Sequence, residues 1–328
     1  MKKKIAVFLM ISLLISALAG CSGAAADTQT EKTVRLGGLK GPTSMGMVKL
    51  LEDAEQGISE NTYAFTMAGS ADELTAGIMK GDLDILAVPV NLASVLYQKS
   101  AGEIRLLAVN TLGILYIVEK GGQTVTDMKD LKGKTIYATG KGSTPEYTLF
   151  YLLNQNGIDP ETDVTVLWKN EPTEIVAAMG LEETALAMIP QPYATVAQTQ
   201  IPDLRVALDL TQQWQKANGA GQCLTAGLIV RADFAQKNPD AVKTFLKEYA
   251  ASAAYVNENP AEAAVLIEKQ GIVKAAIAQK AIPQCNIVCI TGNEMKDAAA
   301  GYLGVLYAQN PASVGGKLPG EDFYQIYE

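Results

Sequence analysis

Two stretches of the chain, ILAVPVNLAS (residues 85–94) and LAMIPQPYAT (residues 186–195), decide the fold. In each, an apolar run ends at a proline, Pro89 or Pro190, and small residues follow it. A short apolar run bounded in this way is typical of a buried strand of a parallel sheet, and small residues suit the start of a helix. The chain is therefore predicted to build the same strand-to-helix corner twice, at an offset of 101 residues.

Each corner ends a longer series in which strands and helices alternate. The first series begins with a strand at residues 33–39 and the second with a strand at residues 134–139. At the offset of 101, nine positions of the first series carry the same residue in the second, and three of them form the motif Lys40-Gly41-x-Thr43. Duplication of one unit, or chance convergence on the common alternation of strands and helices, would explain this match. Both predict parallel sheets with helices on their faces.

Two further apolar stretches are predicted to connect the two series. Residues 104–120 form an apolar run that is too long for one ordinary strand, so we expect it to leave one lobe and enter another. Residues 223–231 are the second candidate crossover strand, and from Asp233 onward the chain is mostly helical and is expected to pack on the first lobe. The predicted fold is α/β: two doubly wound lobes joined by two crossover strands, with a ligand cleft between them.

The crossovers set the predicted boundaries. Lobe 1 is expected to comprise residues 33–112 plus 226–328, and lobe 2 residues 113–225. The predicted hinge residues lie on the crossover strands and are Asn110, Thr111 and Thr225.

The first residues have the pattern of a processing signal. Lys2, Lys3 and Lys4 precede an apolar run that is too short for a comfortable membrane span. The run ends in Leu-Ala-Gly-Cys at Cys21, which resembles the bacterial lipobox. Residues 1–20 are therefore predicted to be a lipoprotein signal peptide, Cys21 the lipidated residue, and residues 21–32 a flexible tether. This predicts an extracytoplasmic protein that its lipid anchors to the bacterial cell membrane.

Composition argues against several classes of function. The formal net charge of −8 becomes −11 when the three leader lysines are lost, which argues against nucleic acid as a partner. The chain has no histidine, and it lacks the glycine-rich phosphate loops and nucleophile motifs of common enzymes. Cys285 and Cys289 lack the further ligands of a zinc site, and they are expected to be buried thiols or to include one disulfide partner of Cys223. No catalytic residue, metal site or cofactor is predicted.

Polar residues gather at the predicted corners, where the strands of both series end. In open parallel sheets, ligands bind beyond the carboxyl ends of the strands, where helix N-termini offer free N–H groups. Plain N-capping of the helices is the competing explanation for these residue types, and Ser70 with Glu73 fits a capping box. The candidate ligand contacts are Thr43, Ser44, Ser70, Asn91, Gly142, Ser143, Thr144, Gln191 and Tyr193.

The chain also resembles a known family. The lipobox, the segment LKGKTIYATGKGSTPEYTLFYLLNQNGIDP (residues 131–160) and the two corner stretches are similar to ABC-transporter substrate-binding lipoproteins of the nitrate/sulfonate/taurine and thiamine-precursor branch. The resemblance covers essentially the whole mature chain. It implies the type II periplasmic-binding-protein fold, capture of a small-molecule ligand between the lobes, delivery to ABC permease subunits, and a monomer. It also implies that the corner residues named above contact the ligand.

The ligand class stays open at this stage. A sulfonate- or taurine-like anion and a pyrimidine-like heterocycle both suit the family, and none of the four arginines lies on a predicted corner. Two other functions are compatible with the same fold. One is a lipid-anchored ligand sensor without a transport role, and the other is an enzyme of thiamine-pyrimidine or menaquinone synthesis.

Overall fold

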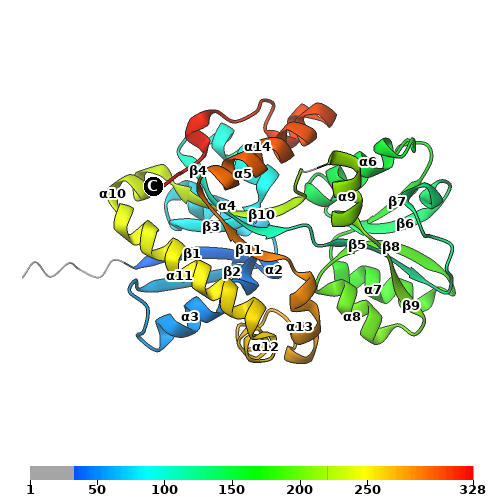
Figure 1. Ribbon diagram of the computed structural model, residues 1–328, viewed down its shortest axis with the longest axis horizontal. Coiled ribbons are helices and arrows are strands. Elements are labelled where there is room, and N and C mark those ends of the chain that lie inside the picture. Colours follow the sequence, from blue (N-terminus) through cyan, green and yellow to red (C-terminus); the bar gives the residue numbers. More distant parts are fainter. Residues whose placement is uncertain (1–32, 220, 328) are drawn as a thin grey trace, which may run out of the picture. The chain divides into compact units, whose positions relative to one another are not determined.

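The structure is a computed structural model that describes residues 33–219 and 221–327 (Figure 1). The predicted signal peptide (residues 1–20), the lipidated Cys21 and the tether (residues 21–32) lie outside the described residues. Within the described part, none of the helices has both the length and the apolar character that a membrane crossing requires.

The described chain contains two mixed sheets, which we take as the centres of the first and second lobes. In the first lobe the strand order is β11-β4-β10-β3-β1-β2, and in the second it is β7-β6-β8-β5-β9. The strands of the first sheet are β1 (Val34–Leu39), β2 (Tyr63–Ala68), β3 (Ile85–Pro89), β4 (Ile104–Leu112), β10 (Leu224–Arg231) and β11 (Ile287–Ile290). Those of the second are β5 (Leu115–Lys120), β6 (Thr135–Thr139), β7 (Thr165–Lys169), β8 (Ala185–Pro190) and β9 (Leu204–Asp209).

Helices cover both faces of each sheet (Figure 1). The helices of the first lobe are α2 (Pro42–Met45), α3 (Val48–Glu55), α4 (Ala71–Lys80), α5 (Val90–Lys99), α10 (Ala232–Lys237), α11 (Pro239–Glu258), α12 (Pro260–Lys269), α13 (Ala275–Ala281) and α14 (Gly292–Gln309). Those of the second lobe are α6 (Thr144–Gln155), α7 (Pro172–Leu181), α8 (Tyr193–Gln200) and α9 (Leu210–Asn218). Short 3₁₀ turns are η1 (Met128–Leu131), η2 (Ile282–Gln284), η3 (Pro311–Val314) and η4 (Glu321–Phe323).

The two lobes repeat one architecture, as the sequence predicts. In each, a central parallel strand pairs with two parallel neighbours: β1 with β2 and β3, and β6 with β7 and β8. Moving α4 along the chain by 101 residues places it on α7 without any shift, and the same offset places β3 on β8 within one residue at the start. The strand that follows in each sheet is antiparallel, and the crossing chain supplies it: β10 beside β3, and β5 beside β8.

The long apolar run at residues 104–120 forms the first crossover, as predicted, and it is divided into β4 and β5 by Gly113 and Ile114. Figure 1 shows the chain passing between the sheets here and again in the segment that leads into β10. The lobe boundaries proposed from the sequence, 112/113 and 225/226, stay a prediction.

Two local expectations are wrong. The polar segment after β9 is the helix α9, which the side chain of Asp209 caps by accepting from the backbone N–H of Thr211 at 2.8 Å. Ser70 does stand at the N-cap position of α4, but the expected capping box is absent. Its hydroxyl instead donates to Glu73 Oε1 at 2.9 Å, because the carboxylate is a stronger acceptor than the hydroxyl and turns toward it.

The hydrophobic core is continuous across the crossover. One buried cluster joins Val88 and Leu106 of the first lobe to Leu115 and Leu149 of the second. Two further clusters lie on the remaining faces, one beneath α3 and α11 and one beneath α7 and α8. The crossover strands are therefore buried in a core that both lobes share.

Candidate ligand-binding site

The first corner is tied to the crossover strand β4. The hydroxyls of Thr43 and Ser44 both donate to the carbonyl oxygen of Leu39, at 2.9 and 2.6 Å. Asn110 then donates from Nδ2 to the carbonyl oxygen of Thr43 at 3.0 Å. All three polar side chains are buried. A movement of β4 at Asn110 is therefore transmitted directly to the backbone of this corner.

Asn91 and Thr144 bring the two lobes into direct contact. Thr144 begins α6 of the second lobe, and its hydroxyl donates to Asn91 Oδ1 on α5 of the first lobe at 2.9 Å. Asn91 also donates from Nδ2 to the carbonyl oxygen of Ser313 at 3.2 Å. Both side chains are buried. Two residues that the sequence assigns to opposite sides of one site therefore lie side by side.

Gln191 makes a second contact between the lobes. Its Nε2 donates to Gln284 Oε1 at 2.6 Å, and its Oε1 accepts from the hydroxyl of Thr195 at 2.9 Å. Tyr116, on the strand next to β8, donates to the carbonyl oxygen of Gln284 at 3.2 Å. Gln284 was not among the residues singled out from the sequence, because it lies in the C-terminal part of the chain, far from any predicted corner.

Four of the predicted ligand contacts make no hydrogen bond between the lobes. Ser70 is exposed, and Gly142 donates its N–H to the carboxylate of Glu146, in the first turn of α6, at 2.5 Å. Ser143 donates to the carbonyl oxygen of Gly140 at 2.8 Å. Tyr193 is half-buried, and burial, followed by the charge of Glu171, raises the pKa of its phenol.

Simple capping does not explain the corner hydroxyls. Ser70 and Ser143 occupy N-cap positions, yet neither side chain accepts a hydrogen bond from its helix. Each of them donates elsewhere, and Thr43 and Ser44 also donate rather than accept. The hydroxyls of Ser70 and Ser143 therefore do not satisfy the N–H groups at the starts of α4 and α6.

The predicted hinge residues lie where β4 and β10 pair. Asn110 and Thr111 are fully buried in β4, and a register shift between Leu224 and Ala226 leaves Thr225 outside the regular ladder. Such a bulge locally weakens strand pairing and allows the strand to bend. The assignment of these three residues to a hinge stays a prediction.

Gly113, between β4 and β5, lies in a crowded part of the crossover. A Cβ atom at this position would lie 2.2 Å from Thr211 Oγ1 and 3.2 Å from Cys223 Sγ. Asn286 Nδ2 also donates to the carbonyl oxygen of Gly113 at 2.6 Å. Only glycine allows the second lobe to approach the crossover this closely.

Three aromatic rings line the junction of the lobes, and we call them the aromatic cluster: Tyr151, Trp214 and Tyr302. The ring of Trp214 on α9 lies 4.6 Å from that of Tyr151 and 5.3 Å from that of Tyr302, measured between centroids. Tyr302 belongs to α14 of the first lobe, so this contact also crosses between the lobes. Trp214 and Tyr302 are almost completely buried.

The hydroxyl of Tyr302 lies among polar groups of the second lobe. Burial, followed by the neighbouring Cys223, raises its pKa, and the hydroxyls of Thr148 and Thr144 act in the opposite direction. Burial also raises the pKa of the Cys223 thiol to about 12, so this thiol is protonated at neutral pH. Cys223, Cys285 and Cys289 are all free thiols, which answers the question of a disulfide.

The aromatic cluster is not evident from the sequence, because the segment that forms α9 is mostly polar. Leu210, Trp214 and Ala217 follow one another at the spacing of one helical face, and this signal identifies an amphipathic helix. No comparable signal points from Trp214 to Tyr302, because 88 residues separate them and only the packing of α14 brings them together.

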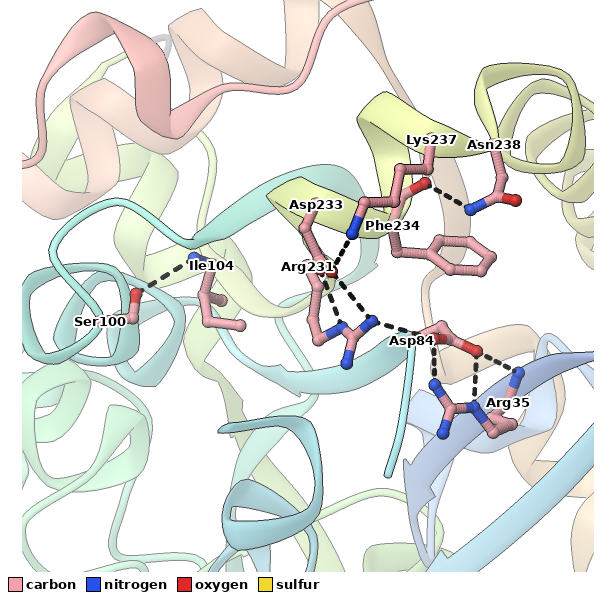
Figure 2. A network of polar contacts seen from close by, with 9 residues as sticks. All are labelled: Arg35, Asp84, Ser100, Ile104, Arg231, Asp233, Phe234, Lys237 and Asn238. Carbon is pink, nitrogen blue, oxygen red and sulfur yellow. Dashed lines mark hydrogen bonds and ion pairs between the residues drawn. The ribbon is translucent and has the colours of Figure 1, made fainter. Parts of the chain in front are cut away.

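All four arginines are engaged away from the junction of the lobes. Arg205 pairs with Glu119, and Arg105 donates to Gln325 Oε1 at 3.2 Å. Figure 2 shows the other two on either side of the buried Asp84 carboxylate. Arg35 donates to it from Nε at 2.9 Å and from Nη2 at 2.6 Å, and Arg231 Nη2 lies 3.6 Å away.

This ion network lies at the opposite end of the strands from the corners. Arg35 is at the start of β1, Asp84 directly precedes β3, and Arg231 ends the antiparallel β10. The network therefore fastens three neighbouring strands together at the end that faces away from the site. Among the described residues, no group of three or more His, Cys, Asp or Glu side chains is placed to hold a metal ion.

The comparisons with known proteins agree with this fold. Residues 104–263 match the family described as NMT1/THI5 like. A crystal structure of an ABC transporter protein from Parabacteroides distasonis is similar at a TM-score of 0.76 and 24% identity, over 90% of this chain and 99% of that one. The periplasmic aliphatic sulphonate binding protein SsuA from Escherichia coli is similar at a TM-score of 0.71 and 17% identity, over 90% and 94%.

A third similar structure is the periplasmic nitrate-binding protein NrtA from Synechocystis PCC 6803, with a TM-score of 0.58, 16% identity, and coverage of 75% of this chain and 68% of that one. A search of curated protein sequences found no significant match. The resemblance predicted from the sequence is confirmed: the chain has the two-lobed α/β fold of ABC-transporter substrate-binding proteins and contains an NMT1/THI5-like region.

Proposed function

We propose that the protein is an extracytoplasmic solute-binding lipoprotein of an ABC importer, which captures a small organic solute and delivers it to the permease. The observation that carries this proposal is the buried hydrogen bond between Asn91 and Thr144. It joins polar side chains at the N-termini of two helices that each follow a strand, one on each lobe. A bound solute with polar groups can take the place of such a contact and hold both lobes at once.

Closure is proposed to occur by bending of the crossover strands. Gly113 separates β4 from β5, and Thr225 lies in a bulge of β10, so both connections contain a point of reduced pairing. Asn110 links the bend to the first corner through the backbone of Thr43. A ligand that contacts both lobes only in the closed form shifts the equilibrium by its differential affinity for that form.

The proposed ligand contacts remain the nine corner residues named from the sequence. In support, Asn91, Thr144 and Gln191 are buried and make hydrogen bonds between the lobes, and Thr43 is buried in the first corner. The lipobox at Cys21 supports anchoring on the outer face of the cell membrane, close to the permease that would receive the solute.

A labelled full-length protein tests this proposal. Cysteines introduced at the exposed positions Ile58 and Leu181 place one spin label on each lobe. The interlobe distance and the melting temperature are then measured in nitrate, methanesulfonate, taurine, thymine and nicotinamide. Saturable binding stabilises the fold by about 2.7 kcal/mol at a hundredfold excess over Kd, and it should narrow the distance distribution.

Uptake by cells tests the same proposal. Loss of the protein, or replacement of Cys21 by alanine, should reduce uptake of the compound that binds. Chemical turnover of a bound compound, or binding without any change of the interlobe distance, would contradict the receptor function.

A further inference from the structure

We infer that the C-terminal segment of the chain orients the Asn91 side chain, so that Asn91 presents a hydrogen-bond acceptor, and not a donor, toward the second lobe. We call residues 310–327 the C-terminal strap. The inference rests on the proposed function, because it concerns a residue that is proposed to contact the solute. It assigns a positioning role to Ser313 and Ser94, neither of which is among the candidate ligand contacts.

The first observation is the direction of the hydrogen bonds at Asn91. Its Nδ2 donates to the main-chain carbonyl oxygen of Ser313 at 3.2 Å, and its Oδ1 accepts from the hydroxyl of Thr144 at 2.9 Å. A carbonyl oxygen only accepts, so turning the amide over would set two acceptors against each other. Asn91, Thr144 and Ser313 are all buried, and water therefore does not relieve such a clash. A solute group that takes the place of the Thr144 hydroxyl has to donate a hydrogen bond.

The second observation is how firmly the strap holds this carbonyl group. The buried hydroxyl of Ser94 on α5 donates to the carbonyl oxygen of Val314 at 2.7 Å. The hydroxyl of Ser313 donates to the carbonyl oxygen of Leu306 on α14 at 3.2 Å. Farther along, the N–H of Gln325 donates to a carbonyl oxygen of β4 at 2.8 Å. The strap is therefore fixed to two helices beside Asn91 and to the crossover strand at its other end.

The third observation is that the second corner fixes its amide in the opposite direction. Thr195 corresponds to Ser94 at the offset of 101 residues. It donates its hydroxyl to Gln191 Oε1 at 2.9 Å and its N–H to the same atom at 3.3 Å. Gln191 therefore presents its Nε2 toward the first lobe, where it donates to Gln284 Oε1 at 2.6 Å. Equivalent hydroxyls thus bind the strap in one lobe and the corner amide in the other.

Two matched substitutions in the full-length protein test the orientation, because a carboxylate only accepts. Asn91→Asp places a carboxylate oxygen against the main-chain carbonyl of Ser313, which the strap holds in place. Gln191→Glu places one against the side-chain amide of Gln284, which is exposed and can rotate to donate, while Thr195 donates to the other oxygen. Both positions are buried, so burial raises the pKa of both new carboxyl groups and their difference reports the orientation.

Urea unfolding from about pH 3.5 to 7.5 measures both pKa values. The carboxyl group of Asn91→Asp should keep its proton to a higher pH than that of Gln191→Glu, although the ordinary values, about 3.9 and about 4.3, have the reverse order. A raised pKa means that stability is lost as the pH rises, so Asn91→Asp should lose about tenfold or more in its folded-to-unfolded ratio by pH 7. The ordinary order of the two pKa values, or a loss that does not depend on pH, would show that the orientation is wrong.

A double-mutant cycle tests the strap without placing a charge in the core. Ser94→Ala removes a hydrogen bond to the strap, and Thr144→Val removes the donor that faces Asn91. If the strap acts through Asn91, their combined effect on the folded-to-unfolded ratio should fall short of the product by about 3- to 10-fold. Tyr97→Phe is the matched control, because its hydroxyl also joins α5 to the strap, at Asp322 Oδ1 and 2.6 Å, but at an exposed place. Its effect should combine with that of Thr144→Val to within about twofold of the product.

The outcomes separate this inference from the receptor function. Independent effects in both pairs of variants would mean that the strap supports α5 only in a general way, and they would overturn the positioning role. None of these measurements needs a solute, so that result leaves the receptor function standing. A failure of binding and uptake would overturn the receptor function, and the orientation of Asn91 would still be decided by the two carboxyl variants.

Discussion

Replacing Asp84 by asparagine should destabilise the protein without affecting ligand binding. The Asp84 side chain is only 1% exposed and neutralises Arg35 and Arg231 together. Asparagine keeps an acceptor for the backbone N–H of Arg35, which donates to Oδ2 at 3.0 Å, but it removes the negative charge between the two guanidinium groups. The variant therefore isolates the contribution of that charge.

The magnitude follows from the exposure of the two arginines. Breaking a fully buried ion pair costs about 3–5 kcal/mol. Here the side chain of Arg35 is 40% exposed and that of Arg231 20% exposed, so water compensates part of the loss. We expect a decrease of about 2–3 kcal/mol in the free energy of unfolding, which lowers the melting temperature by about 4–8 °C in a chain of this size.

Urea unfolding at pH 7, together with calorimetric titration of a bound compound, measures both quantities. Asp233→Asn is the control, because Asp233 belongs to the same network but is 45% exposed, and its exposed ion pairs contribute about 1 kcal/mol or less. Equal losses in the two variants would refute the argument from burial. A weaker Kd for Asp84→Asn would refute the placement of the network away from the ligand.

Three further predictions concern the crossover and the second lobe. Gly113→Ala should lower the free energy of unfolding by about 1–2 kcal/mol, because crowding against Thr211 outweighs the gain of about 0.4–1 kcal/mol from a less flexible unfolded chain. Urea midpoints measure this loss. If adding Thr211→Ala to this variant restores no stability, the contact with Thr211 is not the cause. Thr144→Val should shift the population away from the closed form by about 2- to 12-fold, seen in the interlobe label distance, and an unchanged distribution would count against the corner contact. Burial opposes ionisation of Glu119, yet hydrogen bonds, first those from Thr124, lower its pKa below the ordinary value. Ionised Glu119 therefore stabilises the fold above about pH 4.3, and this stabilisation is lost as the pH falls through the pKa of Glu119 in the folded state. Glu119→Gln should accordingly weaken the dependence of the free energy of unfolding on pH at acid pH. Parallel pH profiles of the variant and the unchanged protein would disprove this.

The alternation of strands and helices was predictable because it depends on local patterns. The apolar run before Pro89 and the one before Pro190 can be buried only as central strands, and both became central strands. The places of Asn91 and Thr144 beyond strand ends follow from the same logic, since the carboxyl ends of parallel strands meet at one edge of each sheet, but their direct contact across the lobes does not. Contacts such as that of Gln191 with Gln284 do not follow, because nothing local determines where a distant helical segment docks.

The repeated corner also shows how little a duplicated residue fixes by itself. Thr43 and Thr144 correspond at the offset of 101 residues, yet the hydroxyl of Thr43 donates within its own corner and that of Thr144 donates across to Asn91. Two similar corners can offer the same hydrogen-bond donors to a ligand from both lobes. Such donors alone do not distinguish one hydrogen-bond-accepting ligand from another. Selection therefore has to come from elements outside the duplicated series, such as α9 and α14.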